Sequence, residues 1–292
     1  MIGIEDLDAL DLTIWLGRGS AAARVLGCNQ STVSRRSGHC LNVFGLNLGR
    51  DEEGWPRTST NDLLQLEREV HQLQRLRQGK GLRLDASLLA APLLQGGTPA
   101  GWIHGSLDSL GWQRPLQLLN ERILDAWITA MGQEIKATSP AGMLCVPLLI
   151  TPLQLAAAAD HPLLGQGTLR PSDLAGMPRL APRAGAYPRT EQLLGPWREQ
   201  QPALTLASGP RRRLAESDGT APDLALHYGT RFSLAHQNLL TPLPLELSVP
   251  TQLCLLMRRD ISDQAAMLQL LHHLQKRATQ AAKADLGMPC PN

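Results

Sequence analysis

The side chains with the clearest chemical pattern lie just after Gly27, where Asn29 opens the run Asn-Gln-Ser-Thr-Val-Ser-Arg-Arg. Proteins use amide, hydroxyl and guanidinium groups to contact the base edges and phosphates of DNA. Six of these side chains and two arginines farther along are therefore candidate DNA contacts: Gln30, Ser31, Thr32, Ser34, Arg35, Arg36, Arg50 and Arg57. Arginine reaches phosphates at least as readily as guanines, so neither Arg35 nor Arg36 is assigned to a base.

The charge around these residues is one-sided, although the net charge of the whole chain is only +2. No Asp or Glu occurs from Leu12 to Arg50. The same stretch contains the basic residues Arg18, Arg24, Arg35, Arg36 and Arg50. A basic stretch of this kind predicts a phosphate-binding surface, and an ordinary solvated face is the alternative.

Catalytic and metal-binding patterns are missing from the sequence. It has no Gly-x-Ser-x-Gly, P-loop, His-Glu-x-x-His or paired-cysteine motif, so we predict no enzyme activity, catalytic residue, metal site or cofactor. The five cysteines are widely spread and fit the reduced thiols of a cytoplasmic protein, with Cys28 a packing residue. Since no signal peptide and no apolar run of ~18 residues is present, we expect no membrane contact.

Three short helices must position the candidate DNA contacts. Apolar residues at helical spacing predict a first helix over 4–16, a second over 21–26 and a third that begins after Asn29. Gly27 supplies a tight turn between the last two helices, and Asn29 is a suitable N-cap. Two short helices joined in this way are typical of a helix-turn-helix.

A longer helix is predicted over residues 60–78. Its apolar residues repeat at 3-4-3 spacing in a single narrow stripe, formed by Leu63, Leu66, Val70 and Leu73. Such a stripe is typical of one side of a coiled-coil pair, so we predict that these residues mediate dimerisation. The alternative is an ordinary amphipathic helix that packs on the second domain.

Beyond Gly81 the sequence alternates between two patterns. Short apolar segments typical of strands occur at 82–86, 126–131, 143–150 and 253–257, and helical patterns occur at 115–123, 190–200 and 262–282. This alternation predicts an α/β domain with a parallel-type sheet. We therefore divide the chain into residues 1–59, a linking helix at 60–80, and an α/β domain at 81–292.

Three segments share a pattern that goes beyond their separate chemistry. The first is Ala22-Ala23-x-x-Leu26-Gly27-Cys28-Asn29-Gln30-Ser31-Thr32-Val33-Ser34-Arg35-Arg36. The others are Leu119-x-x-x-Ile123-Leu124-Asp125-Ala126-Trp127-Ile128, and Asp160-His161-Pro162-Leu163 followed by Ser172-Asp173-Leu174-Ala175-Gly176. In their order and spacing, these segments resemble the LysR-type transcriptional regulators over nearly the whole chain.

The resemblance implies a mixed fold: an all-α winged helix-turn-helix, a long linker helix, and a two-lobed α/β effector domain like the periplasmic binding proteins. It implies a sequence-specific transcriptional regulator whose DNA-binding geometry is modulated by a small-molecule effector in the C-terminal cleft. The implied partners are double-stranded DNA, the effector, and further copies in a homodimer or homotetramer. Ser87 stands where the family often offers a hydroxyl to an effector carboxylate, Thr129 ends the strand after Asp125, and Tyr187 lies in a loop that leads to a second-lobe helix. These three are the candidate effector contacts, and capping or surface polarity is the alternative for each.

Some segments depart from the family pattern. Ser37 and Gly38 stand where a large apolar residue and a helix former are usual, and Asp51, Glu52 and Glu53 put negative charge in the expected wing. The stretch 95–101 is shorter than usual. These departures favour the alternative function, a divergent constitutive DNA-binding or protein-interaction scaffold that has lost effector sensing.

Overall fold

The N-terminal part of the computed structural model contains three helices and a short hairpin. The structure describes residues 2–52, 54–94, 96–105, 112–130, 134, 141–177, 179–181, 188–195, 203–205, 226–230, 233, 240–245, 247 and 249–285. The helices are α1 (Ile4–Leu16), α2 (Gly19–Leu26) and α3 (Gln30–Phe44). Strands β1 (Gly49–Arg50) and β2 (Pro56–Arg57) pair antiparallel in the hairpin of residues 49–57, called the wing below.

Local sequence explains where these helices begin and end. Gly27 has φ +62°, a left-handed conformation that glycine adopts without steric cost, and it ends α2 just before α3 begins. Helix α2 begins at Gly19, two residues earlier than predicted, and α3 continues through Gly38. Asn29 occupies the N-cap position with extended backbone, but its side chain makes no capping hydrogen bond.

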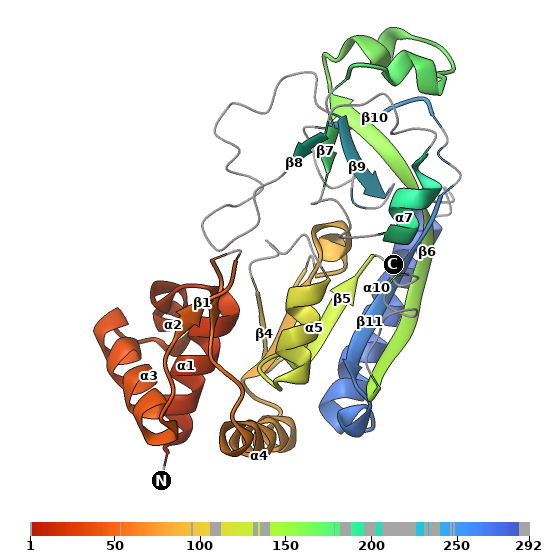
Figure 1. The fold of residues 1–292 in the computed structure, drawn as a ribbon. Coiled ribbons are helices and arrows are strands. Elements are labelled where there is room, and N and C mark those ends of the chain that lie inside the picture. The colour runs from red at the N-terminus through yellow and green to blue at the C-terminus, as the bar shows by residue number, and fades with distance from the viewer. Residues whose placement is uncertain are drawn as a thin grey trace.

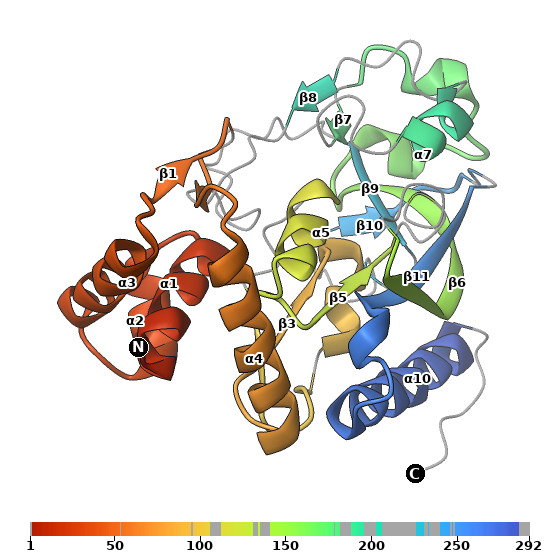
Figure 2. The ribbon, with the colours of Figure 1, turned by 60° about the horizontal axis from the view of Figure 1, so that its bottom comes forward.

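Helix α4 (Asp62–Gln78) corresponds to the predicted linking helix. The Asn61 side chain caps it by accepting a hydrogen bond from the backbone N–H of Leu64. Both ribbon views place α4 between the N-terminal helices and the strands that follow it (Figure 1, Figure 2).

The rest of the chain forms one extended mixed sheet with helices on its sides. Its strands are β3 (Leu82–Ala86), β4 (Trp102–His104), β5 (Ala126–Thr129), β6 (Met143–Ala158), β7 (Arg179–Ala181), β8 (Ala203–Thr205), β9 (Leu226–Thr230), β10 (Leu240–Pro242) and β11 (Pro250–Arg258). The helices are α5 (Gln113–Asn120), α7 (Pro188–Leu193) and α10 (Ala265–Asp285). Short 3₁₀ helices are η1 (Leu88–Leu94), η2 (Pro162–Gly165), η3 (Pro171–Leu174) and η5 (Arg259–Ile261).

The strand order divides this sheet into two lobes. Among the described residues it runs β4-β3-β5-β11-β6-β9-β7-β8, with β10 also paired to β6. The first lobe consists of β3, β4, β5, η1, α5 and α10, and the second of β7 to β10 and α7. Strands β6 and β11 pair along nine positions and run through both lobes, as Figure 1 shows.

The expectation of a parallel-type sheet is only partly right. Strand β3 is parallel to β4 and β5, and β7 is parallel to β8 and β9. However, β11 runs antiparallel to both β5 and β6. Two long strands that cross between lobes in opposite directions must pair antiparallel, and alternation along the sequence does not reveal this. The mixed sheet still matches the two-lobed fold that the resemblance implies.

The N-terminal helices and the first lobe share one hydrophobic core. It includes Leu10 and Ile14 of α1, Leu119 at the end of α5, and Trp127 of β5, all buried. Complete burial of a side chain of this size contributes roughly 1.5–3 kcal/mol. This shared core fixes the position of the helical domain relative to the first lobe, even though the sequence suggests two separate units.

Candidate functional site

The first turns of α3 present a polar face away from the protein core. Gln30, Ser31, Ser34 and Arg35 are exposed and Thr32 is half-buried, whereas Val33 points into the core. The hydrophobic core under α3 holds this face in place. The structure therefore brings five of the eight predicted DNA contacts together on one helical surface.

A hollow lies beside this surface, between the helix ends and the wing. Its volume is about 390 Å³, and it is lined by Thr13, Gly17, Arg18, Gly19, Ser20, Gln30, Leu48, Gly49, Arg50 and Pro56. Arg18 and Arg50 give it positive charge, and the first turn of α2 adds backbone N–H groups that attract anions. Its positive charge and its backbone N–H groups suit a phosphate. Composition suggested Arg18 as part of the basic stretch, but the sequence did not place it beside Arg50.

One of the three acidic residues of the wing, Asp51, has a structural role. The Asp51 carboxylate accepts a hydrogen bond from the backbone N–H of Trp55 at 2.8 Å, and the Asp51 N–H donates to the Trp55 carbonyl at 3.0 Å. Asp51 therefore closes the hairpin turn. The Arg50 guanidinium donates to the carbonyl of Gly54, while Arg57 is exposed on the paired strand. Glu52 is exposed, and Glu53 lies outside the described residues.

Arg36 is oriented differently from its neighbours. Its guanidinium forms an ion pair with Glu5 at the start of α1, and its side chain is 25% exposed. One turn farther along α3, His39 Nδ1 lies 3.0 Å from Asp6 Oδ2. Arg36 thus lies on the side of α3 that faces α1. It pairs with Glu5 at the surface, whereas Arg35 is exposed.

The two sides of α4 have opposite characters. Leu63, Leu66 and Val70 are 67%, 60% and 59% exposed, and Leu73 is half-buried. The opposite side of α4 packs on the N-terminal helices and the first lobe. Its buried residues include two leucines as well as the charged Arg68 and Arg75, so the helix does contact the second domain through this side.

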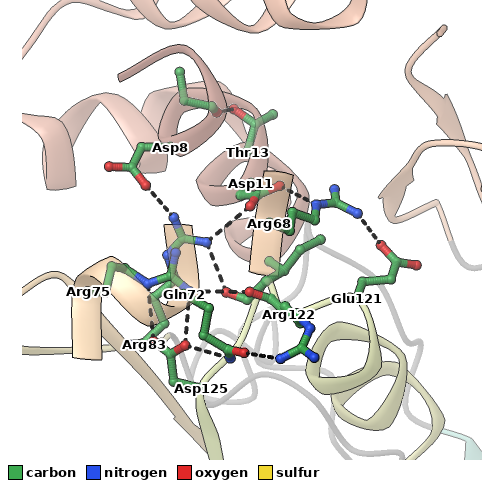
Figure 3. Close-up of polar contacts among 12 residues, drawn as sticks. Asp8, Asp11, Thr13, Arg68, Gln72, Arg75, Arg83, Glu121, Arg122 and Asp125 are labelled. Carbon is green, nitrogen blue, oxygen red and sulfur yellow. Dashed lines mark hydrogen bonds and ion pairs between the residues drawn. The ribbon is translucent and has the colours of Figure 1, made fainter. Parts of the chain in front are cut away.

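Four arginines gather between α1, α4 and the first lobe (Figure 3). Asp11 of α1 binds Arg68 at 2.9 Å and Arg83 of β3 at 3.5 Å. The buried Asp125 carboxylate binds Arg75 at 2.9 Å and accepts a hydrogen bond from the Arg83 backbone N–H at 2.8 Å. Burial, and then the neighbouring Arg75 charge, lower the pKa of Arg83 below its usual value. We call this group of residues, completed by Asp8, Gln72, Glu121 and Arg122, the arginine network.

A separate contact joins α1 to the strand that leads to the predicted effector site. The indole N–H of Trp15 donates to Asp85 Oδ2 on β3 at 2.9 Å. Gly105 is packed so closely that an added Cβ would lie 2.7 Å from the same oxygen. A side chain there would displace the carboxylate, so the close approach requires glycine.

The predicted effector residues lie at the ends of β3 and β5 where the structure describes them. Ser87 is 7% exposed, and its hydroxyl accepts a hydrogen bond from the backbone N–H of Ala130 at 3.2 Å. Thr129 is fully buried. Both residues lie at the carboxyl ends of neighbouring parallel strands, and Ser87 bridges the two strands through Ala130. Tyr187 lies outside the described residues.

A contact between the lobes was not anticipated from the sequence. Glu134 follows β5 in the first lobe and is buried, and its carboxylate accepts a hydrogen bond from the backbone N–H of Thr190 in α7 at 2.6 Å. A carboxylate in contact with a backbone N–H of the opposite lobe can hold the lobes together. No motif marks this glutamate, because its partner lies 56 residues away.

Three further features of the described residues concern a buried thiol, metal-ligating side chains and the apolar character of the helices. Burial, followed by the Asp11 charge, raises the pKa of Cys40 to about 12, so this thiol stays protonated and unreactive at neutral pH. Within the described ranges, no group of three or more His, Cys, Asp or Glu side chains could hold a metal ion. None of the helices seen there combines the length and apolar character needed to cross a membrane.

Comparisons with known proteins point to one family. A family model described as the LysR substrate binding domain matches residues 103–279. A curated relative, a probable nitrogen assimilation transcriptional activator of Synechococcus elongatus, is 25% identical over 199 residues. That match covers 62% of this chain and 64% of the relative, so it spans less than two thirds of the relative's length.

Solved structures show the same fold. A full-length OxyR variant of Pseudomonas aeruginosa matches with a TM-score of 0.53 at 16% identity, covering 94% of this chain and 95% of that one. ArgP from Mycobacterium tuberculosis also has a TM-score of 0.53 at 16% identity, covering 96% and 98%. Both similarities extend over the helical N-terminal part as well as the mixed sheet.

Proposed function

The chain belongs to the LysR family of transcriptional regulators with an effector-binding domain, and from this premise we propose that it binds double-stranded DNA sequence-specifically through α3 and the wing. One observation carries the proposal: the exposed polar turn of α3 lies beside a hollow that contains Arg18 and Arg50. A helix of this kind reads base edges in the major groove, while neighbouring cations bind phosphates. The proposed activity is regulatory rather than catalytic, and its place is the cytoplasm.

We assign the DNA contacts to the exposed members of the predicted set and the half-buried Thr32, namely Gln30, Ser31, Thr32, Ser34, Arg35, Arg50 and Arg57. Arg36 supports them through Glu5. Arg18 joins the set because it lines the hollow with Arg50. A phosphate in this hollow would sit near two guanidinium groups and the first turn of α2, which would fix the register of α3 on DNA.

The exposed stripe of α4 supports assembly. Leu63, Leu66, Val70 and Leu73 match one side of a coiled-coil pair, and three of the four side chains are more than half exposed in the single chain. A second α4 covering this stripe would bury apolar surface that water otherwise contacts. We therefore propose a homodimer through α4, from which a homotetramer can be built.

Small-molecule control is proposed at the edge where β3 and β5 end. Ser87 accepts a hydrogen bond from Ala130, which leaves its hydroxyl hydrogen for donation to an effector oxygen. Thr129 lies on the paired strand, and Tyr187 would come from the second lobe. An effector that changes the closure of the lobes would bias the assembly between two DNA-binding geometries.

A second candidate is a constitutive DNA-binding or interaction scaffold. It is favoured by Glu134, whose carboxylate already binds the Thr190 N–H across the lobes. An internal carboxylate at this place would keep the lobes joined without an external acid. The shortened stretch at 95–101, which follows the 3₁₀ helix η1, also favours this candidate.

Two experiments test these proposals. Repeated selection from random double-stranded DNA should enrich a palindromic site with half-sites about 10 base pairs apart, as expected for a two-fold dimer. Failure to enrich any sequence would contradict sequence-specific binding. Thermal unfolding with a panel of amino acids and carboxylic acids should then show a stabilising ligand if the protein senses an effector. If none stabilises the wild type but one stabilises Glu134→Gln, the scaffold candidate is supported.

A further inference from the structure

A residue of the first lobe reaches into the DNA-binding domain. Arg114 is the second residue of α5 and lies within the stretch that matches the effector-domain family. Its Nη2 donates to the Pro56 carbonyl at 3.0 Å and to the Ile14 carbonyl at 2.8 Å. Pro56 begins β2 and Ile14 lies in the last turn of α1. One guanidinium therefore ties the wing to the first helix.

The same guanidinium contacts the base of the wing turn. The Arg114 Cζ lies 5.6 Å from the centroid of the Trp55 ring, within the range of a cation–π contact. Arg114 and Trp55 are 8% and 7% exposed, so solvent screens this contact little. The backbone N–H of Trp55 donates a hydrogen bond to the Asp51 carboxylate, and this contact closes the hairpin turn. A continuous series of contacts thus runs from α5 to the tip of the wing.

The strand that Arg114 holds carries the wing's candidate DNA contacts. Arg57 follows Pro56 directly, and Arg50 is the pairing partner of Pro56 across the hairpin. The positions of Arg50 and Arg57 relative to α3 therefore depend on a side chain outside the DNA-binding domain.

We propose that Arg114 is the positioning residue through which the first lobe sets the wing for DNA binding. This inference rests on the proposed DNA-binding function. Helix α5 leads through Asp125 into β5, which ends at Thr129. If the end of β5 near Thr129 is displaced, α5 would move with it, and Arg114 would move the wing. The effector domain would then influence DNA contact within one chain, in addition to any change in the geometry of the dimer.

The test compares two methionine variants of α5. Arg114→Met keeps a long side chain but removes the donors and the charge, whereas Gln113→Met alters an exposed neighbour on the same helix. Deuterium exchange is measured in the free full-length protein. The backbone amides of Asp51 and Trp55 should exchange about tenfold faster in Arg114→Met, which corresponds to the loss of about one hydrogen bond, while α3 amides keep their rates.

DNA binding gives the second readout, on a fragment selected from random sequence. Arg114→Met should bind about tenfold more weakly. It should lose the hydroxyl-radical protection that Arg57→Ala also loses, and keep the protection that depends on Arg35. Arg114→Lys, which retains the charge and a donor, should recover part of the affinity. If Arg114→Met does not fold, Trp55→Leu breaks the same contact from the wing side.

If the backbone amides of Asp51 and Trp55 exchange deuterium at equal rates in Arg114→Met and Gln113→Met, the inference is overturned. The inference is also overturned if Arg114→Met loses hydroxyl-radical protection uniformly across the whole DNA site. If the wild-type protein enriches no DNA sequence, the proposed function fails, but the exchange rates of the wing still decide the role of Arg114. The two failures are therefore distinguishable.

Discussion

Ser37 and Gly38 lie in the middle of α3, the helix that carries most of the candidate DNA contacts. Ser37 is 6% exposed, and its hydroxyl has no hydrogen-bond partner in the described part of the chain. A buried hydroxyl without a partner costs about 1–3 kcal/mol. Gly38 adds a helix-interior glycine with no atom near the place where its Cβ would be. Both residues lower the stability of α3: Ser37 faces the protein interior, and Gly38 lies on the exposed face of the helix.

Gly38→Ala should therefore stabilise the protein by about 0.5–1 kcal/mol, because alanine loses less backbone entropy in a helix and meets no clash here. The matched variant is Gly45→Ala, at the C-cap of the same helix. Gly45 has φ +64°, so alanine there should destabilise by about 1 kcal/mol. Urea unfolding measures both changes. A loss of stability in Gly38→Ala would show that α3 is packed differently at this point.

At the level of elements, α4 separates an apolar side from a charged one. The exposed stripe faces away from the chain, while the opposite side is bound to Asp11 and Asp125 through Arg68 and Arg75. Because the charged side anchors the helix, the stripe remains available to a second copy. Assembly and folding therefore depend on different residues of one helix.

Leu66→Glu should abolish the dimer and leave the fold intact. A carboxylate placed in an apolar seam loses its hydration when the second helix docks, whereas in the single chain it stays in water. Sedimentation should show a change from twice the chain mass to the chain mass. Gln78→Glu, an exposed change at the end of the same helix, is the control. A Leu66→Glu dimer as stable as the wild type would place the interface elsewhere.

Elements whose signals are local could be predicted from the sequence. The first helix has the predicted bounds, Ile4–Leu16, and the helix at 60–78 differs only at its start. Contacts between distant residues could not be predicted this way. The pairing of β11 with β6 joins segments about a hundred residues apart, and no sign in the sequence indicated that Arg36 would pair with Glu5.

At the scale of the whole molecule, the arginine network makes the helical domain and the first lobe one unit. Asp8 and Asp11 come from α1, Arg68 and Arg75 from α4, and Asp125 from the entry to β5. Except for the partly exposed Asp8, these charges are buried together, so each one depends on its partners. Removal of one partner from a buried ion pair costs about 3–5 kcal/mol, because the remaining charge is left unpaired.

Asp125→Asn should lower the free energy of unfolding by about 3–5 kcal/mol, since it removes the carboxylate bound by Arg75 and by the Arg83 N–H. Asp263→Asn is the control, because Asp263 is exposed, and such surface changes stay within about 0.5 kcal/mol. Chemical denaturation followed by both tryptophan fluorescence and circular dichroism gives the two values. If Asp125→Asn is as stable as the control, the network does not hold the two parts together.

The most direct test of the DNA-binding surface is the salt dependence of affinity for a selected DNA fragment. For the wild type, the logarithm of the binding constant should fall linearly with the logarithm of salt concentration. Arg35→Ala should weaken binding about tenfold, and Arg18→Gln should reduce the salt slope by about one, as expected for one lost phosphate contact. Lys276→Ala, an exposed change on α10, should alter neither value. If all three variants show the affinity and slope of the wild type, DNA does not bind at α3 and the hollow beside it.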